Sequence, residues 1–139
     1  MRSVLVALAT LALAACDSGP DLDAAGDLVL TAVGDGFFLE TEEAYGCANI
    51  PLVVEAEAAS GDLVIEVLGV GEVEVCLRAF GPATVTVPAP DEPGQAYDVV
   101  LRKDGRTDTY AYACGIAGCD LTPVGEPAFS RLGPVPRPG

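Results

Sequence analysis

Histidine and tryptophan are absent from this chain of 139 residues, and lysine and arginine together occur only seven times. Without histidine, the chain cannot form a Ser-His or Cys-His nucleophile pair, an imidazole acid or base, or a histidine-ligated zinc site. The basic residues are outnumbered by 21 acidic ones, which gives a formal charge of −14 at pH 7. That charge repels phosphate backbones, so we expect no nucleic-acid partner.

The N-terminal apolar segment, residues 4–15 (VLVALATLALAA), is too short to cross a membrane. A transmembrane helix needs about 20 apolar residues. A short apolar segment that follows a basic residue, here Arg2, is instead typical of a secretory signal. We therefore expect residues 1–15 to be a signal peptide rather than part of the fold.

The end of this segment, Leu13-Ala14-Ala15-Cys16, resembles the lipobox of bacterial lipoprotein precursors. The resemblance covers these four residues and the apolar segment before them. It implies cleavage before Cys16, attachment of diacylglycerol to its sulfur and, often, a further acyl chain such as palmitate on the new amino terminus. Two or more acyl chains anchor a protein stably to a membrane. Asp17 matches a retention signal that favours the periplasmic face of the inner membrane, with the outer membrane or cell surface as the alternative.

Four cysteines remain besides Cys16, and an even number in an exported chain predicts two disulfides. Three pairings are compatible with the sequence. We favour Cys114–Cys119, which closes a short turn, together with Cys47–Cys76. The alternative is a four-cysteine metal site, which would need two closely spaced pairs. Cys47 and Cys76 lie far apart, so the disulfides are preferred.

Apolar and polar residues alternate along much of the chain, which is typical of half-buried antiparallel strands. The clearest hairpin joins residues 97–103 to 107–114 through Asp104-Gly105, a dipeptide that favours tight strand turns. No segment predicts a helix. The pattern favours a single all-β, immunoglobulin-like sandwich of about eight antiparallel strands, at residues 27–33, 36–40, 50–58, 62–68, 72–79, 83–88, 97–103 and 107–114.

We expect the sandwich domain to span residues 27–120, between two extended segments. Residues 16–26 contain the lipidated Cys16 and a short acidic tether. Residues 121–139 contain five prolines, which predicts an extended or polyproline tail. This tail either lies loosely on the surface or docks in an aromatic groove of a partner, with Phe129 as its apolar anchor.

Five glutamates lie opposite the apolar rows of three expected strands. If these strands are neighbours, the glutamates form an acidic sheet surface that suits a basic partner or divalent cations. The alternative is a solvated outer face that keeps the protein soluble. These residues are Glu55, Glu57, Glu66, Glu72 and Glu74.

Calcium is the one cofactor that we consider, because oxygen ligands occur at residues 40–43, 91–92 and 104–108. Calcium needs six to eight converging oxygens, and no single loop supplies them. We therefore expect no resident metal. Neither Ser60 nor Ser130 has a base beside it in sequence, so we expect no enzymatic activity. The sequence favours a lipid-anchored, non-enzymatic interaction or structural module of the cell envelope, with an envelope protein as partner. The alternative is a calcium-dependent binding or adhesion module.

Overall fold

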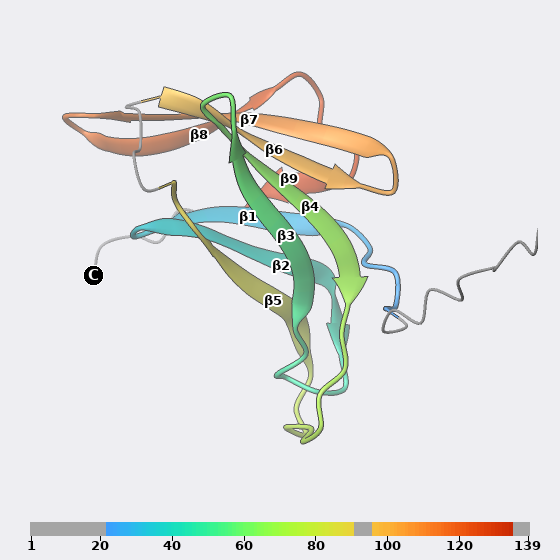
Figure 1. Cartoon of the computed structure of the whole chain (residues 1–139). Helices are drawn as coiled ribbons and strands as arrows, with labels where there is room; N and C mark the ends of the chain where they lie inside the picture. Colours follow the sequence, from blue (N-terminus) through green and yellow to red (C-terminus); the bar gives the residue numbers. More distant parts are fainter. Residues whose placement is uncertain (1–21, 91–95, 135–139) are drawn as a thin grey trace, which may run out of the picture.

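The computed structural model describes residues 22–90 and 96–134. The expected signal peptide, Cys16 and residues 135–139 lie outside these ranges. The described residues form nine strands and no helix (Figure 1). The strands are β1 (Leu28–Val33), β2 (Gly36–Tyr45), β3 (Leu52–Ala59), β4 (Asp62–Val70), β5 (Gly81–Pro88), β6 (Ala96–Lys103), β7 (Arg106–Gly115), β8 (Gly118–Val124) and β9 (Ser130–Leu132).

Two sheets pack against each other, which confirms the predicted all-β sandwich. The first sheet has the order β5-β2-β1-β9 and the second the order β3-β4-β6-β7-β8. In Figure 1, β3 and β4 cross in front of β1, β2 and β5. Two pairings are parallel rather than antiparallel, β1 with β9 and β4 with β6. β4 and β6 are parallel because the chain crosses to the other sheet to form β5 between them. It then returns to the five-stranded sheet as β6, in the same direction as β4.

The core lies between the sheets and is built from the inward rows of alternating residues. Tyr97, Val99 and Leu101 on β6 are all buried. The fully buried Tyr110 on β7 is the cross-strand partner of Val99. Tyr112 contacts the Phe37 ring edge-on, with the ring centroids 5.2 Å apart. The predicted 97–114 hairpin is thus confirmed, and its alternate residues face the core. The other buried apolar strand residues include Leu28, Leu30, Phe37, Leu39, Leu63, Ile65, Val67, Ala83 and Val87.

The turn between β6 and β7 has the predicted form. Asp104 and Gly105 both take left-handed backbone conformations, with φ of 51° and 73°. Positive φ at both central residues matches the twist of a two-residue hairpin. The flanking residues Lys103 and Arg106 are therefore direct partners across the strands.

Both predicted disulfides are present. Cys114 and Cys119 pair directly across β7 and β8, and their bond closes the turn between these strands. The Cys47–Cys76 bond has a Cα–Cα distance of 5.2 Å and joins two loops outside the sheets. Each bond thus fixes a connection rather than the core itself.

The prediction of a strand at residues 72–79 is wrong, because this segment is a loop between β4 and β5. Its backbone groups bond to another loop instead of to a neighbouring strand. Asn49 accepts a hydrogen bond from the Leu77 amide and donates one to the Val75 carbonyl. These bonds pair two backbone groups of the segment outside any sheet, and the Cys76 disulfide ties the segment to the same loop.

The expected domain boundaries also need correction at both ends. Residues 118–124 form β8, residues 130–132 form β9, and Phe129 is buried in the core. Pro123 lies in β8, which is an edge strand where a missing amide donor is tolerated. At the other end, the Asp23 backbone pairs with Val70, so the domain includes part of the expected tether.

Candidate functional site

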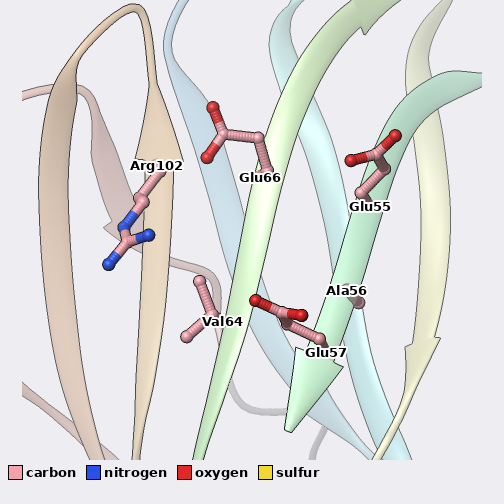
Figure 2. Close-up of a pocket in the computed structure, with 6 residues that line it drawn as sticks. All are labelled: Glu55, Ala56, Glu57, Val64, Glu66 and Arg102. Atoms are coloured by element: carbon pink, nitrogen blue, oxygen red, sulfur yellow. The ribbon is translucent and has the colours of Figure 1, made fainter. Parts of the chain in front are cut away.

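Three of the five predicted glutamates lie together on the outer face of the second sheet (Figure 2). Glu55 on β3 pairs with Glu66 on β4, and Glu66 pairs in turn with Arg102 on β6. Glu57 lies two residues along β3 from Glu55, and therefore on the same face. The strand register thus brings three carboxylates and one guanidinium to one surface.

These residues line an open hollow of about 480 Å³, which we call the acidic groove. Its remaining lining residues are Ala56 and Val64. Figure 2 shows the carboxylates of Glu55 and Glu57 on one side of β4 and Arg102 on the other. Within residues 22–90 and 96–134, no groove carboxylate forms an ion pair with a lysine or arginine. The groove therefore presents negative charge that is open to solvent and to a basic ligand.

Glu72 and Glu74 do not belong to this surface, which corrects the sequence expectation. Both are exposed on the loop between β4 and β5. The alternation of residues 72–79 is the pattern of a strand, but the pairing that would align these two glutamates with Glu55 is absent.

The calcium candidates are distributed over separate parts of the fold. Among the described residues, no three acidic or cysteine side chains gather closely enough to hold a metal ion. Glu42 pairs with Arg131, and the Thr41 hydroxyl accepts a hydrogen bond from the Ala83 amide. Residues 91–92 lie outside the described ranges.

Asp108, another calcium candidate, is buried and binds the segment before β9. Its carboxylate accepts hydrogen bonds from the Ala128 amide at 2.7 Å, the Phe129 amide at 3.0 Å and the Ser130 hydroxyl at 2.6 Å. Ser130 is within 2.8 Å of the Tyr110 hydroxyl. Burial by itself raises the pKa of Asp108, but these hydrogen bonds outweigh it and hold the pKa below its ordinary value.

Lys103 is the second charged residue in the interior, and it binds the N-terminal segment. Its ammonium donates to the carbonyls of Ala25 and Gly26, and it lies 5.2 Å from the centre of the Phe129 ring. Arg106 lies over the same ring at 5.3 Å. Burial and the nearby Arg106 charge lower the pKa of Lys103. The Lys103 side chain therefore contacts both the N-terminal segment and Phe129 near the C-terminal strand.

Neither buried charge was singled out from the sequence as a core residue, although one signal was available. Strict alternation places Lys103 on the same face as Leu101, and Asp108 on the same face as Tyr110. A charged residue in an apolar row is costly to bury unless it is paired or hydrogen-bonded. Their positions in apolar rows therefore indicate that segments distant in sequence supply hydrogen-bond partners for Lys103 and Asp108.

Comparison with known proteins identifies no relative. The chain matches no protein-family model, no curated protein and no solved structure. Across the described ranges, no helix has the length and apolar character needed to span a bilayer.

Proposed function

We propose that this protein is a lipid-anchored, non-enzymatic interaction or structural module of the bacterial cell envelope. The observation that carries the proposal is the lipobox-like Leu13-Ala14-Ala15-Cys16, followed closely by a sandwich with two disulfides. Disulfides form and persist in oxidising compartments outside the cytoplasm. The bonds and the sequence motif therefore support the same compartment independently.

The short distance between Cys16 and the fold supports a role close to the membrane. Asp23 is already paired with Val70, so seven residue steps separate Cys16 from the sandwich. Such a segment spans at most about 25 Å when fully extended. A domain held this closely acts on partners in or beside the same membrane.

The anchor is tested by the intact mass of the mature protein purified from bacterial membranes. We expect a chain that begins at Cys16 and carries the added mass of a diacylglycerol. The Cys16→Ala variant should keep residues 1–15 attached or leave the membrane fraction. An unmodified Cys16 in a protein recovered from the soluble fraction would contradict the proposal.

The partner is tested by crosslinking the lipidated protein in its own membranes, followed by mass spectrometry of the captured proteins. The acidic groove is examined with the double variant Glu55→Lys and Glu57→Lys. The matched control is Glu72→Lys with Glu74→Lys, which changes the net charge equally but lies outside the groove. A partner lost only in the groove variant assigns recognition to that surface. No enriched partner with the wild type would contradict the interaction role.

A further inference from the structure

Exposed apolar side chains gather on one lobe outside the two sheets. We define the stapled lobe as residues 46–51 and 71–80, which the Cys47–Cys76 disulfide joins. The exposed fractions are 73% for Val75, 57% for Leu77 and 86% for Phe80. Single exposed apolar residues are ordinary, but three within six residues concentrate apolar exposure on one loop, which is a feature of contact surfaces.

The lobe holds these side chains on a fixed backbone. Asn49 donates to the Val75 carbonyl at 2.7 Å and accepts from the Leu77 amide at 3.0 Å. The Ala48 amide also donates to the Leu77 carbonyl at 3.0 Å. Since these bonds and the disulfide fix the loop, it cannot easily refold to bury its apolar side chains.

The outer part of the lobe differs in charge from the rest of the protein. Residues 46–51 (GCANIP) and 75–80 (VCLRAF) contain no acidic residue, and Arg78 is the one charged residue among them. The whole chain has three times as many acidic as basic residues. Glu72 and Glu74 lie on the same loop beside β4, so the whole lobe has two acidic residues against one basic residue.

The lobe begins where the N-terminal segment meets the fold. Asp23 and Val70 exchange two backbone hydrogen bonds, of 3.1 Å and 2.8 Å, and the lobe starts at the next residue, Gly71. In Figure 1 the lobe extends from the end of β4 at the bottom of the view, whereas the turn between β7 and β8 lies at the upper left. A lipid on Cys16 would therefore keep Asp23, at the base of the lobe, within about 25 Å of the bilayer surface.

We propose that the stapled lobe contacts the lipid bilayer, with Val75, Leu77 and Phe80 in the interfacial region and Arg78 near the phosphates. This inference rests on the proposed lipid anchor at Cys16. Apolar side chains enter the boundary between headgroups and acyl chains, and an arginine among them interacts with anionic lipids. The short tether to the proposed lipid favours a membrane over a protein partner at this surface. The lobe would orient the sandwich and keep its acidic outer surfaces away from the lipid phosphates.

A single tryptophan probe tests this contact, because the wild-type chain contains none. The mature lipidated Phe80→Trp variant is reconstituted in vesicles of phosphatidylcholine and phosphatidylglycerol with brominated acyl chains. The matched control is Ile116→Trp, which replaces a fully exposed apolar residue in the other disulfide-closed turn. We expect blue-shifted emission and quenching by bromine for the residue 80 probe, and neither effect for the residue 116 probe.

The outcomes separate the two proposals. Intact mass establishes whether Cys16 carries lipid in the sample used. If Cys16 is acylated and both probes emit like free tryptophan in water without quenching, the lobe does not contact the membrane and the anchor proposal survives. If Cys16 is not acylated, both proposals fail. Because Phe80 is exposed, the substitution leaves the core unchanged, and Leu77→Trp provides a second probe of the same lobe with the same expected result.

Discussion

The Asp108 carboxylate accepts a hydrogen bond of 2.6 Å from the Ser130 hydroxyl and thereby links β7 in one sheet to β9 in the other. The same carboxylate accepts hydrogen bonds from the backbone amides of Ala128 and Phe129. A buried charge thus holds a segment whose proline content alone predicts an extended tail. Asp108 therefore stabilises the C-terminal part of the sandwich, together with the pairing of β9 with β1.

Replacement of Asp108 by alanine should strongly destabilise the fold. It leaves two backbone amides and a hydroxyl without their acceptor, and each buried unsatisfied donor costs about 1–3 kcal/mol. We expect the free energy of unfolding in urea to fall by about 3 kcal/mol or more, with both disulfides intact. Asp120→Ala, at an exposed position on β8, is the control. Equal stability of the two variants would contradict the assigned role of Asp108.

Asp108 should also make the protein sensitive to acid. Its pKa in the folded protein lies below the ordinary value of 3.8, so the unfolded chain binds a proton more readily. The stabilising contribution is therefore complete above pH 3.8 and is lost as the pH falls through the lower folded value. We expect the Asp108→Asn variant to show a flatter loss of unfolding free energy below pH 4 than the wild type. Parallel curves for the two proteins would refute this assignment.

Lys103 should control the order of the N-terminal segment. In Lys103→Met the apolar stem is kept, but the carbonyls of Ala25 and Gly26 lose their donor. We expect faster hydrogen exchange at the amides of Asp23 and Val70, since their mutual hydrogen bonds depend on the placement of this segment. The amide of Val99 in the core serves as the internal control. Unchanged exchange at Asp23 and Val70 would mean that the segment is held by other contacts.

Two truncations should separate the folded part of the C-terminal region from the rest. A chain that ends at Pro134 keeps β9 and Phe129 and should melt cooperatively, like the full-length protein. A chain that ends at Val124 loses both and leaves the Asp108 carboxylate unpaired, so we expect no cooperative thermal transition by circular dichroism. A cooperative transition in the shorter chain would show that β9 is dispensable.

The two disulfides should contribute unequally to stability. The Cys47–Cys76 bond closes 29 residues and the Cys114–Cys119 bond closes five. Loop-closure entropy gives about 3–4 kcal/mol for the longer loop and about 2 kcal/mol for the shorter. Paired replacement by alanine, followed by urea unfolding, measures each value. A larger loss from the Cys114/Cys119 pair would require an explanation other than chain entropy.

Most of the fold could be predicted from local sequence. Where alternation is regular and a turn dipeptide such as Asp104-Gly105 joins two strands, the predicted hairpin and its buried rows are confirmed. With Cys16 set aside, the spacing of the other four cysteines was sufficient to select the correct pairing. The hairpin and the Cys114–Cys119 bond depend on neighbours in sequence, and the Cys47–Cys76 pairing then follows as the remaining pair.

The remaining parts depend on contacts between distant residues. Residues 72–79 alternate like a strand, but Asn49 and the Cys76 disulfide determine their conformation. The three residues of β9 have too little pattern to predict a strand, and they are positioned by Asp108 on β7. The prediction of an acidic sheet surface is correct for Glu55, Glu57 and Glu66, which lie in regular paired strands. It is wrong for Glu72 and Glu74, which lie in a loop.

The parallel pairing of β1 with β9 places the first strand beside the last one, with Leu28 opposite Ser130. During synthesis, β1 therefore emerges long before β9, although its other neighbour, β2, follows at once. The chain can form hairpins early, but the sandwich closes only after the C-terminal residues have arrived. If the chain is exported as we propose, such delayed closure would keep it threadable during transport, and the sandwich would close on the far side of the membrane.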